Sequence, residues 1–152
     1  MEKITAKELR DIQDSTEPYT LIDTRNKDDF NEWHIKGAVN YDYSIDDPES
    51  KVTYKKINER FGLNREDQII TICAKGKTSG KFAKLLEKRG FKNVKIVKGG
   101  MQAWSSVYDV VNLSTENDDL ILIQLQRRAK GCLGYLIGSK SQGKAIAIDV
   151  SR

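Results

Sequence analysis

The stretch Gln68-Ile69-Ile70-Thr71-Ile72-Cys73-Ala74-Lys75-Gly76-Lys77-Thr78-Ser79 decides the fold of this chain. Its first five residues are largely apolar, as strands are when a parallel sheet buries them on both faces. A helix is predicted over residues 79–89, where apolar side chains recur at helical spacing, and Gly90 is suited to end it. The sequence therefore predicts a β-to-α unit with a cysteine at the carboxyl end of its strand.

Strands and helices alternate on both sides of this unit. Further strands are predicted over residues 19–22, 38–39 and 94–97, and further helices over 5–12, 27–33 and from Pro48 to Gly62. Strands that alternate with helices pair in parallel through right-handed crossovers. The first part of the chain is therefore predicted to be an α/β sandwich, with a central parallel sheet flanked by helices.

The composition changes after Trp104, where helical periodicity fades. Three short strands are predicted over residues 120–125, 133–137 and 145–148. We place the boundary between an α/β domain, residues 1–112, and a short β-rich C-terminal extension, residues 113–152. Because the run 120–123 is apolar on both faces of a strand and a small sheet has open edges, we expect this tail to dock on the first domain or to self-associate.

Composition excludes several classes of protein. The chain is 38% apolar and 32% charged, and no apolar run approaches the roughly 20 residues that a spanning helix needs. Residues 1–5 lack the features of a secretory signal, so we expect a cytoplasmic protein without a membrane partner. With two cysteines and one histidine, an ordinary zinc site would be one ligand short. We therefore expect no metal and no other cofactor.

The charges are distributed unevenly along the chain. Residues 1–72 carry 11 basic and 16 acidic side chains, whereas residues 73–98 carry nine basic side chains and one acidic one. No aromatic side chains interleave with this basic block as they do in single-strand binders, so we expect no nucleic-acid partner. Attraction of a small anion fits the block better, because it begins at Cys73.

Cys73 stands where open α/β sheets bind ligands, outside the carboxyl end of a strand. The backbone N–H groups of the following loop can curl around the sulfur, and the N-terminus of the next helix adds partial positive charge. Lys75 and Lys77 add cations that favour the thiolate, and Gly76 permits the tight backbone that such a loop needs. The alternative interpretation is a buried cysteine that only fills the core.

Three blocks of sequence occur in an order that a known family shares. One block is the loop Cys73–Ser79, which has the pattern Cys-x-x-Gly-x-x with Thr or Ser at its end. A second block is Leu21-Ile22-Asp23-Thr24-Arg25 with Trp33-His34-Ile35-Lys36-Gly37-Ala38-Val39-Asn40. The third block is Gly90-Phe91 with Val94, Gly99-Gly100-Met101 and Trp104. Over about residues 3–106, the chain resembles the rhodanese family of sulfurtransferases. The resemblance implies a rhodanese-like sandwich.

The chain also departs from the family pattern. Trp33 stands where the family usually has Gly, Lys36 replaces Pro, and Thr78 stands where many members have Arg. Phosphatases built on this fold have one more loop residue and an arginine that clamps phosphate. Neither feature is present in the loop that begins at Cys73, so phosphate-processing activity is disfavoured.

The resemblance implies a role for each residue of the site. Cys73 attacks the outer sulfur of a small anionic donor such as thiosulfate and carries that sulfur as a persulfide to a thiol or cyanide acceptor. Substrate-binding residues are Ala74, Lys75, Gly76, Lys77, Thr78 and Ser79, together with Arg25 at the mouth. Asp23 and His34 are structural supports: Asp23 forms an ion pair with Arg25, and His34 is a hydrogen-bonded residue of the core.

The C-terminal tail has a resemblance of its own. Residues 124–138 and 145–149 resemble the opening strands of the metallo-β-lactamase fold of persulfide dioxygenases, without the metal-binding motif that would follow. The tail is then a remnant or a truncated fusion, and Cys132 is a buried strand residue. For the whole chain, the alternative to an enzyme is a noncatalytic rhodanese-like module that carries sulfur or binds a regulatory partner.

Overall fold

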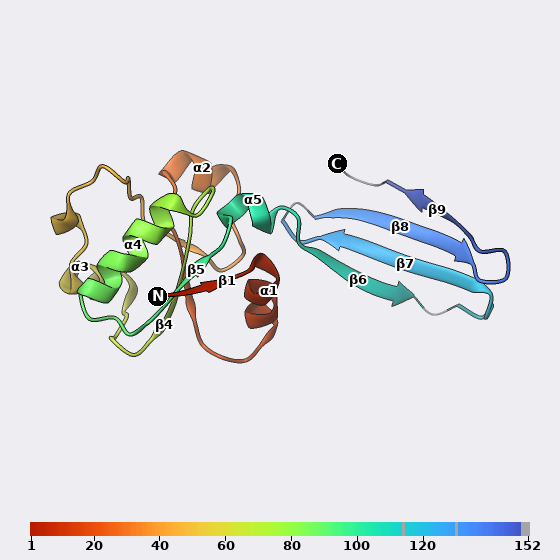
Figure 1. Ribbon diagram of the computed structural model, residues 1–152, viewed down its shortest axis with the longest axis horizontal. Helices are drawn as coiled ribbons and strands as arrows, with labels where there is room; N and C mark the ends of the chain where they lie inside the picture. Colours follow the sequence, from red (N-terminus) through yellow and green to blue (C-terminus); the bar gives the residue numbers. More distant parts are fainter. Residues whose placement is uncertain (114, 130, 150–152) are drawn as a thin grey trace. The chain divides into compact units, whose positions relative to one another are not determined.

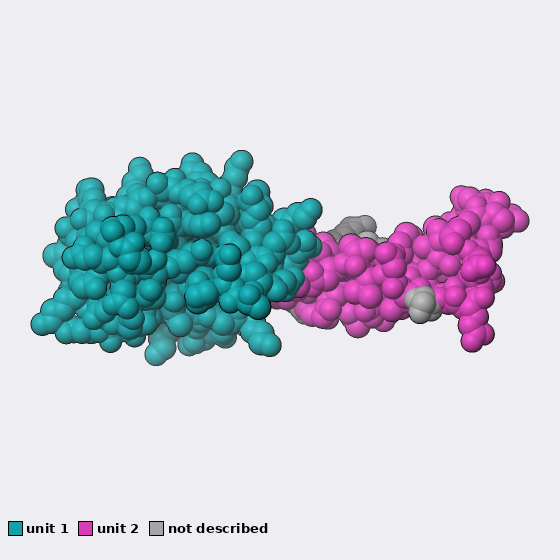
Figure 2. All heavy atoms as spheres, turned by 90° about the horizontal axis from the view of Figure 1, so that it is seen from below, with its two compact units in different colours: residues 1–104 teal, residues 105–152 magenta. Residues whose placement is uncertain are grey.

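The computed structural model describes residues 1–113, 115–129 and 131–149, and it divides into two compact units (Figure 1). Unit 1 is Met1–Trp104 and unit 2 is Ser105–Arg152, shown in different colours in Figure 2. Ser114, Lys130 and residues 150–152, which belong to the predicted tail, lie outside the described residues.

Unit 1 is built on a parallel sheet of five strands in the order β1-β5-β4-β2-β3. The strands are β1 (Glu2–Ile4), β2 (Thr20–Asp23), β3 (Val39–Asn40), β4 (Gln68–Ile72) and β5 (Asn93–Val97). Thr71 of the central strand β4 pairs with Ile22 on one side and with Ile96 on the other. The predicted central parallel sheet is confirmed, and β1 adds an edge strand that the sequence did not indicate.

Helices surround this sheet, and local sequence signals set several of their ends. They are α1 (Ala6–Asp14), α2 (Lys27–Glu32), α3 (Tyr54–Phe61), α4 (Lys77–Lys88), α5 (Gly100–Trp104) and a 3-10 turn, η1 (Glu49–Lys51). The Thr5 hydroxyl accepts from the backbone N–H of Glu8, whose carboxylate accepts from the Thr5 N–H in return. None of the helices in the described part of the chain is long and apolar enough to cross a membrane.

The single helix predicted from Pro48 to Gly62 is wrong. The segment contains η1 and α3, separated at Val52, whose backbone is extended and whose side chain is fully buried. Thr53 then caps α3 by accepting from the Lys56 N–H, and Gly62 ends it with φ of 67°. Burial of Val52 thus breaks the helix that residue propensities alone would continue.

The core of unit 1 lies on both faces of the sheet. One cluster joins Ile22, Ile69 and Ile96 of the strands to Ile57 of α3 and Phe82 of α4. Because side chains alternate along a strand, Leu21, Ile70 and Ile72 point to the opposite face, and they are buried as well. A sheet covered on both faces leaves the strand ends as the places where polar residues can gather.

Unit 2 is an antiparallel sheet in the order β6-β7-β8-β9. Its strands are β6 (Tyr108–Leu113), β7 (Leu120–Arg127), β8 (Cys132–Ser139) and β9 (Lys144–Ile148). The three predicted tail strands are confirmed, and β6 precedes them. Since β6 pairs with β7 along its whole length, the compact units divide between Trp104 and Ser105, whereas the sequence places the boundary after residue 112.

Both faces of the unit 2 sheet carry exposed apolar side chains. Val110, opposite Leu125, is 61% exposed on one face, and Ile146, opposite Ile137, is 62% exposed on the other. The described residues of unit 2 supply no helix and no second sheet to cover them. The unit therefore lacks the second layer around which domains usually bury their core.

Candidate functional site

Cys73 follows β4 directly and is only 4% exposed. Its Sγ accepts a hydrogen bond from the backbone N–H of Gly76 at 3.1 Å and another from the Ser79 hydroxyl at 3.3 Å. Gly76 has φ of 89° and precedes the first residue of α4. The loop therefore curls around the sulfur, as the sequence predicts, and its donors stabilise negative charge there.

The first turn of α5 holds the same loop from another side. The backbone N–H of Met101 donates to the Cys73 carbonyl at 2.8 Å, and that of Gln102 donates to the Ala74 carbonyl at 3.1 Å. A Cβ atom on Gly100 would lie 2.0 Å from the Cys73 carbonyl oxygen, and Gly100 has φ of 58°. Only glycine lets these two backbones approach so closely.

Thr24, which follows β2, also holds the end of β4. Its backbone N–H donates to the Ile72 carbonyl at 2.8 Å, and its hydroxyl donates to the same oxygen at 3.1 Å. Ile72 is the last residue of β4, so both bonds fix the backbone next to Cys73.

A buried ion pair links the residues on either side of Thr24. Arg25 donates from Nε and Nη2 to the Asp23 carboxylate, with an Nη2 to Oδ2 distance of 2.7 Å. The same Nη2 donates to the Trp33 carbonyl at 2.7 Å. Asp23 is fully buried and Arg25 is 9% exposed. Arg25 is thus both the partner of Asp23 and a wall of the cavity at Cys73.

A cavity of about 420 Å³ opens beside Cys73, and we call it the Cys73 pocket. Its lining contains Thr24, Arg25, Asn26, Asp29, Asp42, Tyr43, Ser44, Cys73, Ala74, Lys75, Lys77 and Thr78. The structure thus brings together Cys73, Arg25 and most of the predicted loop residues, while Gly76 and Ser79 act through their bonds to Sγ. Tyr43, one of the lining residues, packs on Phe82, and burial raises the pKa of its phenol.

Sequence reasoning missed the segment 42–44 and Asp29. Residues 42–44 come soon after β3, the edge strand beside β2, so parallel pairing brings them to the same end of the sheet as Cys73. The signal was present in the position of the predicted strand 38–39. These residues add the exposed carboxylates of Asp29 and Asp42, so the Cys73 pocket has mixed charge.

Two predicted burials are wrong. His34 is exposed; its Nδ1 lies 2.8 Å from the Phe30 carbonyl, and its ring stacks on Phe30 with centroids 4.0 Å apart. The hydrogen bond and the ring stacking thus hold His34 just after the end of α2, outside the core. Cys132 begins β8 in unit 2 and is half-buried, since short strands without a covering layer bury their side chains only in part.

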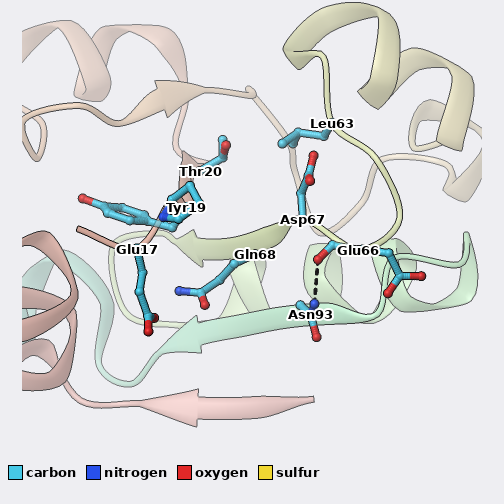
Figure 3. A pocket seen from close by; sticks show the side chains of 9 residues that line it. Glu17, Tyr19, Thr20, Leu63, Glu66, Asp67, Gln68 and Asn93 are labelled. Carbon is cyan, nitrogen blue, oxygen red and sulfur yellow. Dashed lines mark hydrogen bonds between the residues drawn. The ribbon is translucent and has the colours of Figure 1, made fainter. Parts of the chain in front are cut away.

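Figure 3 shows side chains that line a second cavity, which lies at the opposite end of the strands from Cys73. It has a volume of about 490 Å³ and contains residues at the amino ends of β2, β4 and β5. Its Glu66 pairs with Lys92, and its Asp67 accepts from the Asn64 N–H. Because these carboxylates are already engaged, and Cys73 is at the other end, we place the candidate site at the carboxyl ends. No group of metal-ligating side chains forms within the described residues.

The chain is similar to known proteins over most of unit 1. The model of the family described as Rhodanese-like domain matches residues 5–107. The putative sulfur carrier protein YrkF of Bacillus subtilis is 32% identical over 103 residues, which are 68% of this chain and 50% of that protein. Thiosulfate sulfurtransferase 18 of Arabidopsis thaliana is 33% identical over 90 residues, 57% of this chain and 66% of that protein.

Longer proteins and solved structures also match. In maize (Zea mays), the adenylyltransferase and sulfurtransferase MOCS3-2 is 29% identical over 70% of this chain, which spans only 22% of that protein. The chain thus spans from about a fifth to about two thirds of the length of these relatives. A rhodanese-like domain protein from Staphylococcus aureus superposes with a TM-score of 0.54 at 26% identity, covering 68% of this chain and 91% of its own. The chain belongs to the rhodanese-like domain family.

Proposed function

We propose that this chain is a sulfurtransferase in which Cys73 carries sulfane sulfur as a persulfide. The observation that supports this most is the pair of donors, the Gly76 N–H and the Ser79 hydroxyl, aimed at Sγ. A thiolate and a terminal persulfide sulfur are both anionic, and preorganised donors stabilise charge in such a sheltered site. Relatives named as a thiosulfate sulfurtransferase and as a putative sulfur carrier also support the proposal.

The proposed reaction has two displacement steps. With thiosulfate as donor, the Cys73 thiolate attacks the outer sulfur; a bond forms between Sγ and that sulfur, and sulfite leaves with the electron pair of the broken sulfur–sulfur bond. An acceptor thiolate or cyanide then attacks the outer sulfur of the persulfide. That sulfur moves to the acceptor, and the electron pair returns to Sγ. The steps balance without an added oxidant or reductant.

The charged residues that line the Cys73 pocket have different roles in this reaction. Lys75 and Lys77 are exposed and bring positive charge to the mouth, which favours approach of an anionic donor. Arg25 is held by Asp23 and Trp33, so it shapes the wall rather than moving with a substrate.

Intact-mass measurement tests the proposal. After thiosulfate treatment and removal of excess reagent, we expect one added sulfur atom that dithiothreitol removes. The Cys73→Ser variant should gain none, because it lacks the nucleophile but keeps nearly the same side-chain volume. The Cys132→Ser variant should gain it normally. The assignment would be overturned if the Cys73→Ser variant still gained the sulfur atom, or if the unchanged chain gained none.

A noncatalytic sulfur carrier is the second candidate function. The exposed carboxylates of Asp29 and Asp42 beside Cys73 oppose free small anions, which favours sulfur exchange with a macromolecular partner. A carrier would hold one sulfur on Cys73 yet turn over slowly with thiosulfate and cyanide. Steady-state thiocyanate formation measured together with sulfur loading separates the two functions.

Self-association through the C-terminal sheet stays a prediction, and we propose it for unit 2. Its exposed apolar side chains include Val110 and Val111 on β6, and Ile146 and Ile148 on the opposite edge strand β9. Val111, Ile146 and Ile148 lie on one face, so pairing two such sheets through that face would bury them and supply the missing layer. Light scattering on the full chain should give a mass above that of a monomer.

The resemblance of β7–β9 to the opening of a metallo-β-lactamase fold also stays a prediction, since the family model ends at residue 107.

A further inference from the structure

A cluster of lysines lines another cavity beside the Cys73 loop. This cavity of about 350 Å³, which we call the lysine pocket, is lined by Lys3, Lys75, Lys77, Lys84 and Lys98. Lys3 lies on β1, Lys84 on α4, and Lys98 directly after β5. The lysine pocket thus lies on the β5 and β1 side of the loop, whereas the Cys73 pocket lies on the β2 and β3 side. Lys75 and Lys77 line both pockets.

Four of these lysines belong to the basic block of residues 73–98, and they differ from three other lysines of that block, which are paired with carboxylates. Lys88 pairs with Glu49 at 3.3 Å, Lys92 with Glu66 at 2.5 Å, and Lys95 with Glu2 at 3.3 Å. All five lysines of the lysine pocket are exposed, and none of them forms an ion pair with a carboxylate of the described residues. Met1, which also lines the pocket, pairs its amine with Glu87. Positive charge is therefore concentrated where an outside anion can neutralise it.

The lining indicates which kind of anion fits. No arginine is among the lining residues, so the planar fork that grips phosphate at two points is missing. No aromatic ring is among them on which a base could stack. Lysines act as separate point charges on long side chains, and Gly76, Gly80 and Gly99 leave room between them. Carboxylates spaced along a polypeptide match this arrangement better than a nucleotide or an RNA strand.

We propose that the lysine pocket docks an acidic segment of the protein that exchanges sulfur with Cys73. The proposal rests on the proposed function of Cys73 and names the partner of that site. Because Lys75 and Lys77 border both pockets, a segment held there lies against the loop that carries the sulfur. The Cys73 pocket contains the carboxylates of Asp29 and Asp42, so the acidic part of the partner is directed to the lysine pocket. Docking and sulfur exchange thereby use opposite sides of one loop.

The test compares peptides and variants in the full chain. The probe is a fluorescent peptide of consecutive glutamates ending in a cysteine, and its control has glutamines in place of the glutamates. The pocket variant combines Lys3→Ala, Lys84→Ala and Lys98→Ala, which leaves the Cys73 pocket unchanged. The control variant combines Lys7→Ala, Lys36→Ala and Lys144→Ala; these three lysines are exposed, line neither pocket, and change the net charge equally.

We expect the persulfide chain to transfer sulfur to the glutamate peptide at least about tenfold faster than to the glutamine peptide at low salt. The pocket variant should lose this advantage and the control variant should keep it, while transfer to dithiothreitol stays the same in all three proteins. Added salt should reduce the advantage because it screens charges over about 8–10 Å. Equal rates with both peptides, or an equal loss in both variants, would overturn the proposal.

A binding measurement separates this proposal from the proposed function. Fluorescence anisotropy of the glutamate peptide with unloaded chain reports the lysine pocket without any sulfur transfer. Binding that the pocket variant loses supports the lysine pocket even if Cys73 accepts no sulfur from thiosulfate. A single-stranded RNA oligonucleotide that binds the pocket more tightly than the glutamate peptide does would overturn the choice of an acidic protein segment.

Discussion

Replacing Gly100 by alanine should damage the Cys73 site without changing any residue of the Cys73 loop. The added methyl group would lie 2.0 Å from the Cys73 carbonyl oxygen and 2.9 Å from two backbone atoms of Ala74. Real Cβ atoms essentially never approach within 3.0 Å, so one of the two backbones must move by about 1 Å. The hydrogen bond from Met101 to the same carbonyl, 2.8 Å long, would be strained by that movement.

The expected size of the effect follows from two contributions. Alanine at φ of 58° costs about 1–2 kcal/mol of folding stability, and overpacking against a rigid backbone adds about 1–3 kcal/mol. A displacement of about 1 Å at a reacting group can lower the rate about 100-fold. Gly62→Ala is the matched control, because Gly62 has φ of 67° but nothing within 4 Å of its added Cβ.

Urea unfolding and the rate of thiosulfate loading measure both effects. Gly62→Ala should lose about 1–2 kcal/mol and keep its loading rate. Gly100→Ala should lose more stability and, at temperatures where it is still folded, load about 100-fold more slowly. If the two variants behave alike in both assays, Gly100 does not hold the Cys73 loop and the reasoning fails.

Four further predictions concern the same unit and its neighbours. Ser79→Ala removes one of the two donors to Sγ, so loading should slow by about 10-fold, the effect of losing about 1.5 kcal/mol of hydrogen bonding to a charged group; an unchanged rate would show that the Gly76 N–H suffices. Lys75→Ala with Lys77→Ala should weaken use of thiosulfate and lower its salt dependence, as steady-state kinetics from low to high salt would show; unchanged kinetics at low salt would contradict it. Residues 1–107 alone should transfer sulfur normally, and loss of folding by circular dichroism would mean that unit 2 completes the domain. Cys132→Ser should leave turnover unchanged, whereas equal losses at both cysteines would indicate a relay.

The sequence predicted strands such as β4, whose residues are apolar and buried along most of their length. It missed strands such as β1 and β6, which are fixed by pairing with another strand rather than by their own residue pattern. The β4 strand was predicted because it is apolar and buried along most of its length. The β1 strand has three residues and is fixed by pairing with β5, so no local pattern indicates it. The β6 strand holds Asp109 and Asn112 among apolar residues, and its pairing with β7 provides the order that its own sequence lacks.

The site follows the same rule. The loop from Cys73 to Ser79 is local, so its sequence predicted a backbone donor to Sγ, whereas the bond from the Ser79 hydroxyl was found only in the structure. Asp42 reaches the pocket only through the placement of β3 at the edge of the sheet, which a two-residue strand signals weakly. His34 was placed in the core from its motif, although its partner Phe30 lies one helical turn away and both can remain near solvent.

The pairing of β1 with β5 also bears on how the chain acquires its fold during synthesis. β1 is the first element of the chain, yet its partners are residues 95–97, and the backbone N–H of Lys98 donates to the Ile4 carbonyl at 2.8 Å. Domains generally fold as units as they leave the ribosome, and long-range parallel pairing is slow. Met101 and Gln102 hold the Cys73 loop in the folded chain. Both residues follow Cys73 in the sequence, so the thiol is synthesised before the backbone that holds its loop. We therefore expect Cys73 to stay accessible on the nascent chain until α5 has been made.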